Sequence, residues 1–372
     1  MIAAPGNPGI ASLGRCVSIA EAEAVSPDLT VVGPEAPLVD GIVDRFRARG
    51  MRIVGPAREA ARLEGSKIFA KNFFAESGIP TARFRTVENR EEARRAIGAF
   101  GFPVVLKADG LAAGKGVVIA HDRSEAEAAL ETLAGRLVIE EFLEGEEVSF
   151  IALCDGRDAL PLAPTQDHKT VYDGDRGPNT GGMGAYCDSR ILSEKQTRQI
   201  LDGVILPTVE RTTFTGFLYA GLMMTADGPK VLEFNVRLGD PETQPLMHRM
   251  ESDFVPALMA SAEGRLGGTR IEWRTGPSVC VVLASRGYPG SYETGRRIDG
   301  IAAAEETGAT VFQAGTRAGA QGIETAGGRV LGVTASDASL AGAIGAAYRG
   351  VEQIHFDGMH YRTDIGRKGL GR

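Results

Sequence analysis

The chain has 372 residues, of which 43% are hydrophobic and 24% are charged, a composition typical of a globular protein with two or three domains. Its formal net charge of -7 argues against a nucleic-acid partner, because nucleic-acid binding relies on clustered Lys and Arg. No apolar run is long enough to span a bilayer, and the first residues lack the segments of a signal peptide. We therefore expect a cytoplasmic protein without a membrane partner.

The cysteines are scattered along the chain. Cys16, Cys154, Cys187 and Cys280 form no C-x-x-C pair. This spacing is typical of reduced thiols in the cytosol rather than of disulfides or a zinc site.

The first 63 residues have the pattern of a parallel α/β domain. Apolar runs at residues 29–33 and 51–55 predict strands, and residues 38–50 between them predict a helix. Because a β-α-β order joins parallel strands, we expect a parallel sheet here. The next predicted helix begins after Ser66 as its N-cap, ends at Gly78, and carries Lys67 and Lys71.

Residues 64–268 predict a larger unit with a small lobe at about residues 84–146. The lobe would contain strands at 103–108, 117–120 and 137–140, and a helix whose Ser124 and Glu127 have capping-box spacing. Beyond it, the turns Asp155-Gly156 and Asp227-Gly228 predict antiparallel strand pairs. From residue 269 to 372 Gly and Ala become dense around short β runs, which indicates a separate C-terminal α+β domain.

A Gly-rich loop follows the strand that ends at Lys107. It contains Gly114, Lys115 and Gly116. Glycines let backbone N-H groups approach phosphate oxygens, and lysines supply positive charge. The loop is neither a Walker A nor a Rossmann sequence, so a mobile surface turn remains the alternative.

Acidic residues gather where the strand after the small lobe ends and the next strand begins. One interpretation is a hinge whose backbone near Glu140 and Phe142 binds an adenine edge, with Glu147 accepting from ribose hydroxyls. The alternative is a pair of solvated strand ends.

Glu233, Asn235 and Arg237 are spaced by two residues, so on a strand their side chains share one face. The carboxylate and amide oxygens suit Mg²⁺ or Mn²⁺, and Arg237 can hold a carboxylate or phosphoryl group in a bidentate fork. Three polar groups on a core-facing strand would need partners, so a purely structural role explains them poorly.

A long polar loop covers residues 166–184. It begins Gln-Asp-His-Lys, includes Asp175, and ends with Gly-Pro-Asn-Thr-Gly-Gly-Met-Gly. Loops of this length are usually functional or disordered. Since His168 has no second histidine near it, we expect it to form hydrogen bonds rather than bind a metal.

Taken in chain order, these segments resemble the phosphoribosylamine-glycine ligase family of ATP-grasp enzymes over essentially the whole chain. The resemblance is carried by S-K-x-F-x-K, V-L-K-A-D-G-L-A-A-G-K-G, I-E-E-F-L-x-G-E-E-x-S, Q-D-H-K, G-P-N-T-G-G-M-G-A-Y and E-F-N-V-R-L-G-D-P-E-T-Q-P. It implies an N-terminal α/β domain, an ATP-grasp core of two lobes with ATP between them, and a C-terminal α+β domain.

The resemblance also implies a reaction. ATP would phosphorylate the carboxylate of glycine, and the amine of phosphoribosylamine would attack the glycyl phosphate. Arg237 and Lys107 would be catalytic, and Glu233 and Asn235 would hold Mg²⁺ or Mn²⁺. The remaining implied residues bind ATP (Lys67, Lys107, Gly114, Lys115, Gly116, Glu140, Phe142 and Glu147) or the other substrates (Asp175, Asn179, Gly181, Gly182, Arg237, Asp240 and Glu242). The partners would be small molecules. Apart from the resemblance, we expect a monomer, although no sequence feature determines the oligomeric state.

The sequence departs from the family pattern in two places. The family has a strand, a Gly-Gly-Arg-Glu-His loop and a helix before the Ala-Pro-Gly-Asn-Pro-Gly segment with which this chain begins, at residues 4–9. That loop would hold the phosphate of phosphoribosylamine at a helix N-terminus, so the N-terminal domain looks truncated. The linker at residues 130–136 is also shorter than in the family, which we expect to alter lid closure.

Three alternatives stay open on the sequence alone. The chain could be another ATP-grasp carboxylate-amine ligase, an ATP-binding remnant with impaired catalysis, or a sequence that lacks its natural start.

Overall fold

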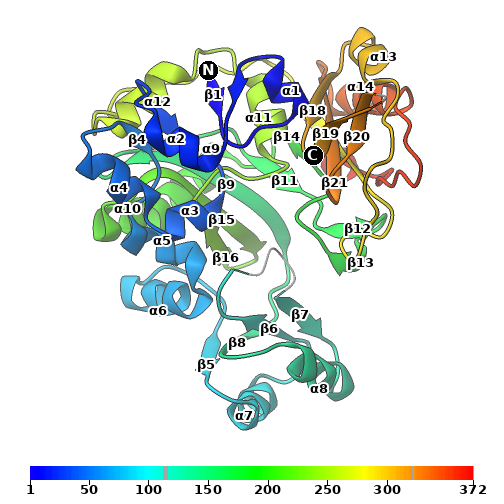
Figure 1. The fold of residues 1–372 in the computed structure, drawn as a ribbon. Helices are drawn as coiled ribbons and strands as arrows, with labels where there is room; N and C mark the ends of the chain where they lie inside the picture. The colour runs from blue at the N-terminus through cyan, green and yellow to red at the C-terminus, as the bar shows by residue number, and fades with distance from the viewer. Residues whose placement is uncertain (112–115, 321, 372) are drawn as a thin grey trace.

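The computed structural model describes residues 1–111, 116–320 and 322–371. Figure 1 shows a broad body with a small lobe below it, which contains β5 to β8, α7 and α8. The N-terminal segments cover one end of the body, and the C-terminal segments lie at the other end. Within the described residues, no helix is long and apolar enough to cross a membrane.

The N-terminal domain combines short strands and helices. They are β1 (Ile2–Ala3), α1 (Pro8–Ala11), β2 (Arg15–Cys16), α2 (Ile19–Ala24), β3 (Thr30–Val31), α3 (Glu35–Val39), α4 (Ile42–Ala48), β4 (Ile53–Val54) and α5 (Arg58–Gly65). The predicted parallel pair is confirmed, because β3 pairs with β4 in parallel. The sequence did not predict β1 and β2, which form a second parallel pair.

The single helix predicted over residues 38–50 is wrong. The chain forms α3 and α4 instead, and Gly41 between them has φ 82°, which is left-handed backbone. The apolar side chains Leu38, Ile42, Val43 and Phe46 are buried on both sides of the break. Because these residues have helical spacing across the break, the sequence predicted one helix and missed the turn that the left-handed backbone of glycine permits.

Helix α6 (Lys67–Ser77) joins the body to the lobe and begins and ends as predicted. The hydroxyl of Ser66 accepts from the Phe69 N-H at 3.1 Å, and Gly78 closes the helix with φ 67°. The lobe then consists of β5 (Phe84–Val87), α7 (Arg90–Phe100), β6 (Val104–Ala108), β7 (Val117–Ala120), α8 (Arg123–Thr132) and β8 (Leu137–Glu141). Its sheet has the order β5-β8-β6-β7 and is antiparallel throughout.

The lobe has a hydrophobic core of its own, in which Leu106, Leu130 and Ile139 are fully buried. The capping box predicted at Ser124 is wrong, because Asp122 caps α8 by accepting from the Glu125 N-H at 2.9 Å.

The central body is built on a large antiparallel sheet. Its elements are β9 (Glu146–Asp155), β10 (Ala159–Pro161), β11 (Thr165–Asp167), β12 (Thr170–Tyr172), β13 (Arg176–Asn179), β14 (Gly184–Cys187), α9 (Glu194–Ile200), the π-helix η1 (Leu201–Ile205), α10 (Leu206–Thr212), β15 (Thr215–Thr225), β16 (Gly228–Asn235), α11 (Thr243–Arg249) and α12 (Val255–Ala262). The two predicted hairpins are confirmed, since β9 pairs with β10 and β15 pairs with β16, both antiparallel.

The C-terminal segment continues the same sheet. Its elements are β17 (Ser278–Ala284), α13 (Ile301–Glu306), β18 (Thr310–Gln313), β19 (Thr316–Gly319), β20 (Gly322–Thr325), β21 (Arg329–Ser336), α14 (Leu340–Val351) and the 3-10 helix η2 (Arg367–Gly369). The strand order is β16-β15-β9-β11-β14-β17-β21-β18, and β14 pairs with β17 so that Ala185 lies opposite Cys280. Strand pairing thus crosses the boundary that the sequence placed near residue 268.

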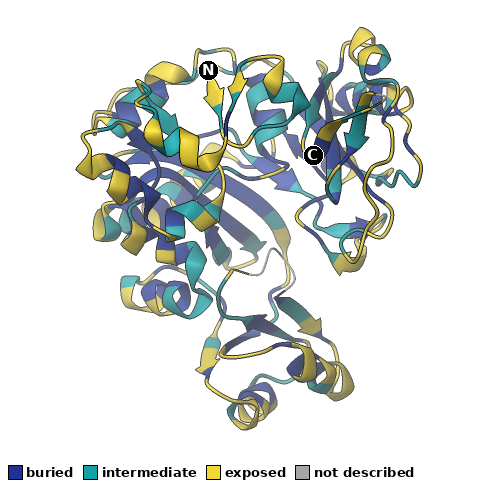
Figure 2. Cartoon of the chain, viewed as in Figure 1, coloured by how far each residue is buried: buried dark blue, intermediate teal, exposed yellow. Residues whose placement is uncertain are grey.

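Figure 2 shows that the strands of the central sheet are largely buried, whereas the helices over it are exposed on their outer sides. All seven residues of β17 are buried, and so are Val148 to Asp155 of β9. The ends of β16 and β11 are only half-buried. These two strand ends face the cleft described below.

Candidate active site

A cleft of about 1530 Å³ lies where the small lobe, the central sheet and both terminal parts of the chain meet. Each part contributes polar side chains to its wall. Examples are Glu35 from the N-terminal domain, Lys107 from the lobe, Glu233 from the central sheet and Arg329 from the C-terminal segment. Among the predicted site residues that the structure describes, only Gly182 does not line the cleft.

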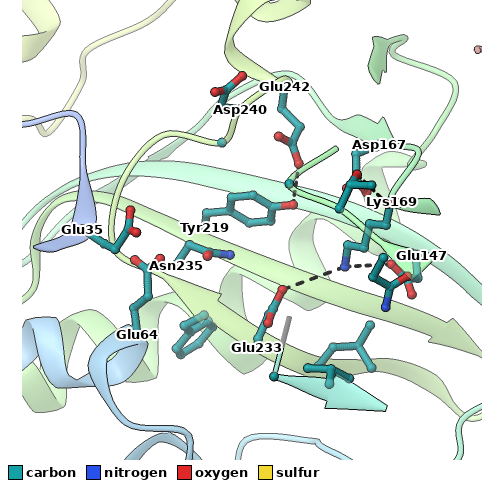
Figure 3. Close-up of a pocket in the computed structure, with 18 of the residues that line it drawn as sticks. Glu35, Glu64, Glu147, Asp167, Lys169, Tyr219, Glu233, Asn235, Asp240 and Glu242 are labelled. Carbon is teal, nitrogen blue, oxygen red and sulfur yellow. Dashed lines mark hydrogen bonds and ion pairs between the residues drawn. The ribbon is translucent and has the colours of Figure 1, made fainter. Parts of the chain in front are cut away.

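The end of β16 supplies the predicted polar face. Glu233 and Asn235 alternate with the buried Phe234, and Figure 3 shows both polar side chains on the cleft side of the strand. The same-face spacing predicted from the sequence is therefore present. Arg237, just beyond the strand, also lines the cleft.

Arg237 lies between two carboxylates that the sequence did not single out. Its Nε is 3.4 Å from Glu35 Oε2, and its Nη2 is 3.3 Å from Glu64 Oε1. Burial raises the pKa of Glu64 to about 7, although Arg237 and the Val236 N-H act in the opposite direction. A guanidinium held from two sides keeps its fork in one orientation.

Lys169 bridges the acids on the other side of the cleft. Its Nζ lies 2.9 Å from Glu147 Oε2 and 3.9 Å from Glu233 Oε1, as Figure 3 shows. Burial works against ionisation of Glu233, but Lys169, Lys107, Lys67 and Arg237 together lower its pKa. Glu233 is therefore an anion, the form in which a carboxyl group can bind a metal ion. The Gln-Asp-His-Lys motif contained Lys169, and the prediction gave this residue no role.

Asp167 is a second residue of that motif without a predicted role. It lies at the end of β11 and lines the cleft. Burial raises its pKa to about 7, because the attraction of Lys169 is opposed by Glu242, Glu147 and Glu233. A carboxyl group with this pKa can exchange a proton near neutral pH.

The predicted phosphate-binding lysines face each other from α6 and β6. Lys67 Nζ donates to the Gly110 carbonyl at 2.8 Å, and Lys107 Nζ donates to the Leu232 carbonyl at 3.0 Å. Burial, the largest effect, lowers the pKa of Lys67. Gly116 accepts from the Ala108 N-H at 2.8 Å. The predicted residues Gly114 and Lys115 lie outside the described residues.

The predicted adenine hinge lies where β8 leads back to the body. Glu140 and Phe142 both line the cleft. The Glu140 side chain is buried between two lysines, with Lys71 Nζ at 3.0 Å and Lys107 Nζ at 3.1 Å. Only the backbone of Glu140 therefore remains for the predicted contact with adenine. Lys71 is a further residue of the cleft, and the sequence prediction of the site did not include it.

The polar loop is fastened to the C-terminal segment. Asp175, in left-handed backbone at φ 55°, lies 3.2 Å from Arg362 Nη2 and 2.7 Å from Lys368 Nζ. The Gly181 N-H donates to the Tyr288 hydroxyl at 2.9 Å, while Arg329 donates to the Gly181 carbonyl at 2.6 Å. These contacts fix the loop that carries Asn179, whose side chain lines the cleft.

The loop after β16 is held in two ways. Arg329 Nη2 donates to Asp240 Oδ2 at 2.8 Å. Glu242 is buried, and its Oε1 accepts from the Tyr219 hydroxyl at 2.5 Å and from the Ser149 hydroxyl at 3.1 Å. Burial and the Glu242 charge raise the pKa of Tyr219 well above its ordinary value. Figure 3 shows Asp240 and Glu242 on the side of the cleft opposite Glu233.

His168 forms a hydrogen bond, as predicted from the sequence. Its ring is buried and accepts from the Gly366 N-H at 3.4 Å. Burial lowers its pKa to about 3, so the ring is neutral. In the described part of the chain, no group of three or more His, Cys, Asp or Glu side chains could hold a metal ion by itself.

Several site residues come from parts of the chain that no motif identified. Arg329, Tyr288 and Lys368 belong to the C-terminal segment, and Glu35 and Glu64 belong to the N-terminal domain. Their chemistry becomes visible only when the fold brings them to the cleft. The Pro-Glu dipeptide at Glu35, which directly follows a predicted strand, was the one local signal available.

Comparison with known proteins covers all three parts of the chain. The N domain of phosphoribosylglycinamide synthetase matches residues 1–64, its ATP-grasp (A) domain matches residues 65–243, and its C domain matches residues 278–368. Two relatives named phosphoribosylamine--glycine ligase are those of Pseudomonas aeruginosa, 48% identical, and Allochromatium vinosum, 49% identical. In both cases the match covers 99% of this chain and 92% of the relative.

Solved structures agree with the sequence matches. The phosphoribosylamine--glycine ligase of Thermotoga maritima is 36% identical, with a TM-score of 0.87 over 98% of this chain and 93% of that one. The biotin carboxylase domain of Hydrogenobacter thermophilus 2-oxoglutarate carboxylase, solved with MgADP and bicarbonate, shares the fold at a TM-score of 0.70 and 18% identity, over 92% of this chain and 77% of that one. With its three matching domains and its near full-length relatives, this chain belongs to the phosphoribosylamine-glycine ligase family.

Proposed function

We propose that the protein joins glycine to phosphoribosylamine and converts ATP to ADP and phosphate, giving glycinamide ribonucleotide for purine synthesis. The observation that carries this proposal is the end of β16. There Glu233, Asn235 and Arg237 line a cleft that Lys67 and Lys107 also line, and both lysines lower the pKa of Glu233. Family membership supplies the identity of the substrates, and this arrangement supplies the chemistry.

The donor set suits Mg²⁺ or Mn²⁺. Glu233 gives an ionised carboxylate, and Asn235 gives an amide oxygen two residues further along β16. Since the described residues hold no cluster of three or more such groups, other oxygens must complete the coordination. Mg²⁺ is usually held by one or two carboxylates, waters and substrate phosphates. When bound, the ion would neutralise charge on the ATP phosphates.

We assign the nucleotide to the space between the lobe and the central sheet. Lys67 and Lys107, together with Gly114, Lys115 and Gly116, would surround the phosphates, while the backbone near Glu140 and Phe142 would meet the adenine. Glu147 would accept from the ribose hydroxyls, for which it would have to share or release Lys169. Phosphoryl transfer depends mostly on positioning and charge neutralisation, and these residues can supply both.

Arg237 would orient the carboxylate of glycine toward the γ-phosphate. A carboxylate oxygen attacks phosphorus and ADP leaves, which gives glycyl phosphate. The guanidinium fork matches both a carboxylate and a phosphoryl group. Glu35 and Glu64 keep the fork aimed, and its contact with Glu64 leaves room for a ligand because Arg237 is still about one quarter exposed at 23%.

The amine would then attack the acyl carbon of glycyl phosphate, phosphate would leave, and the attacking nitrogen would lose a proton. We propose that Asp167 accepts this proton, because it lines the cleft and has a pKa of about 7. The pocket for glycine and the amine would be shaped by the polar loop and the loop after β16, with Asp175, Asn179, Gly181, Gly182, Asp240 and Glu242.

We further propose that the protein acts as a monomer in the cytoplasm. In support of this location, the described cysteines are all free, and three of the four are buried.

A coupled assay tests the proposed function. Phosphate release should require ATP, glycine, phosphoribosylamine and a divalent ion together, and EDTA should abolish it. Mg²⁺ and Mn²⁺ added back separately would distinguish the two ions. Absence of turnover with this complete set, under conditions where MgATP still raises the melting temperature, would contradict the proposal and favour a nucleotide-binding remnant.

A further inference from the structure

Three buried charges lie where the small lobe joins the body. Lys71 on α6 and Lys107 on β6 both contact the carboxylate of Glu140 on β8, at 3.0 Å and 3.1 Å. Their side chains are only 3%, 8% and 2% exposed, respectively. We call these residues the hinge triad.

Strand alternation explains why the triad exists. In the pairing of β6 with β8, Val105 lies opposite Glu140 and Leu106 lies opposite Ile139. Leu106 and Ile139 therefore point into the hydrophobic core of the lobe, while Val105, Lys107 and Glu140 line the cleft. Glu140 faces α6 across this surface and meets Lys71 there.

Both lysines are also tied to neighbouring carbonyl groups of β16. Lys71 Nζ lies 2.6 Å from the Thr81 hydroxyl, which donates to the Val231 carbonyl at 2.6 Å. Lys107 donates to the Leu232 carbonyl at 3.0 Å. The next residue of the strand is Glu233, so the triad sets the lobe against the strand that carries the proposed metal ligands.

The charges of the triad do not balance. Two ammonium groups share one carboxylate in a place with little water, and an excess buried charge is unfavourable unless a counterion is nearby. In agreement, burial lowers the pKa of Lys71 to about 8, and Lys107 contributes in the same direction. Glu141 and Glu233 interact electrostatically with Lys71 and Lys107, respectively, and offset part of this excess. A nucleotide phosphate in the cleft would supply further negative charge.

One of the two lysines could turn to that phosphate only if the other continued to neutralise Glu140. A carboxylate left alone at this depth would cost several kcal/mol. Lys107 is the lysine on the lobe, and the proposed function places it on the phosphates. Lys71 is the one fixed to the body through Thr81.

We propose that Lys71 is a positioning residue for nucleotide binding: it keeps Glu140 neutralised, so that Lys107 can give its charge to a phosphate of the bound nucleotide. This inference rests on the proposed function, because it takes Lys107 as a phosphate ligand. It adds a residue that touches neither substrate nor metal. Lys71→Met should therefore weaken nucleotide binding, and the removal of the Glu140 charge should relieve the defect.

Isothermal titration calorimetry of the full chain with MgADP, which is not turned over, tests this. Lys71→Met should raise the Kd by about 10-fold, or ~1.4 kcal/mol. The double variant Lys71→Met/Glu140→Gln should return to within about threefold of the wild type, since the two positions are coupled. Lys71→Arg, which keeps the charge, should also stay within about threefold.

A matched control separates this role from a general loss of stability. Arg249 is buried to a similar degree but does not line the cleft. Arg249→Met should lower the melting temperature and leave the Kd for MgADP unchanged. If Lys71→Met proves too unstable to measure, Lys71→Gln, which also removes the charge, takes its place with the same expected increase in Kd and the same rescue by Glu140→Gln.

Two results would overturn the inference alone. One is a wild-type Kd in Lys71→Met with only the melting temperature lowered, and the other is a double variant that binds no more tightly than Lys71→Met. A wild-type chain without measurable MgADP binding would instead overturn the proposed function, and the inference with it.

Discussion

Arg237 and Glu64 form an ion pair that joins the end of β16 to the end of α5, with Arg237 Nη2 3.3 Å from Glu64 Oε1. The other oxygen of Glu64 accepts from the Val236 N-H at 2.7 Å. One carboxylate thus positions both the guanidinium and the backbone beside it. Because burial raises the pKa of Glu64 to about 7, this connection changes its protonation near neutral pH.

Glu64 should make stability depend on pH. The pKa is raised from 4.5 to about 7 on folding, so the folded state binds more protons than the unfolded state in this range. The stabilising contribution is fully present below pH 4.5 and is lost as the pH rises toward 7. The free energy of unfolding can be measured in urea for the wild type and for Glu64→Gln. The value for the wild type minus the value for Glu64→Gln should fall by up to ~3 kcal/mol across this window. A difference that stays constant with pH would contradict the prediction.

Arg237 should be more sensitive to replacement than an ordinary cation. Lysine keeps the charge but cannot form the bidentate fork, so Arg237→Lys should lower kcat/KM for glycine by about 100-fold. MgADP should still bind with the wild-type Kd, because the guanidinium is assigned to the carboxylate and not to ADP. The exposed Arg265 offers a control, since Arg265→Lys should not change either value. If Arg237→Lys weakened MgADP binding by the same factor as it lowered kcat/KM for glycine, Arg237 would not be specific to the glycine carboxylate.

Local chemistry made much of the fold predictable. The cap at Ser66, the glycine end at Gly78 and both hairpins each depend on residues close in sequence. The break at Gly41 was missed because the apolar spacing continues across it. The cap of α8 was misplaced because the helix begins two residues earlier than predicted, where Asp122 accepts from the Glu125 N-H. In both places the local sequence is compatible with two structures, and the folded chain adopts the one that was not predicted.

The site also contains some residues that local sequence predicts and others that it does not. The shared face of Glu233 and Asn235 follows from strand alternation, so the sequence alone predicted it. Arg237 lies beyond the end of β16 and lines the cleft from the loop that follows. Arg329 and Lys169 gain their roles from partners in other segments, such as Asp240 and Glu147. No local pattern encodes those distances. Family resemblance identified the motifs that meet in the cleft, and the three-dimensional arrangement added the residues that connect them.

The buried hydrogen bond between Tyr219 and Glu242 should contribute to stability. Tyr219→Phe removes the hydroxyl that donates to Glu242 Oε1 and lies 2.8 Å from the Ser149 hydroxyl, while Ser149 still donates to Glu242 Oε1 at 3.1 Å. Loss of one hydrogen bond to a buried charged group should lower the free energy of unfolding by about 1–3 kcal/mol. Urea denaturation would measure it, and Tyr172→Phe at an exposed tyrosine is the control. No change in Tyr219→Phe would show that water or another group replaces the hydroxyl.

Gly182 has no side chain, and this should allow the polar loop to pack closely against the loop after β16. Its backbone has φ 110°, and a Cβ atom there would lie 2.4 Å from Pro241 Cδ. Gly182→Ala therefore combines backbone strain with a clash, and the relief of that clash must move one loop away from the other. We expect the KM for glycine or for the amine to rise by about 10-fold or more, because small displacements of binding groups are costly.

A second glycine separates the clash from the strain. Gly78 also has positive φ, at 67°, but a Cβ atom there would meet nothing within 4 Å. Gly78→Ala should lower the free energy of unfolding by about 1 kcal/mol through strain alone and leave both KM values unchanged. If Gly182→Ala behaves in the same way, contact with Pro241 does not set the substrate pocket. If only Gly182→Ala raises KM, the spacing of the two loops determines how the substrates bind.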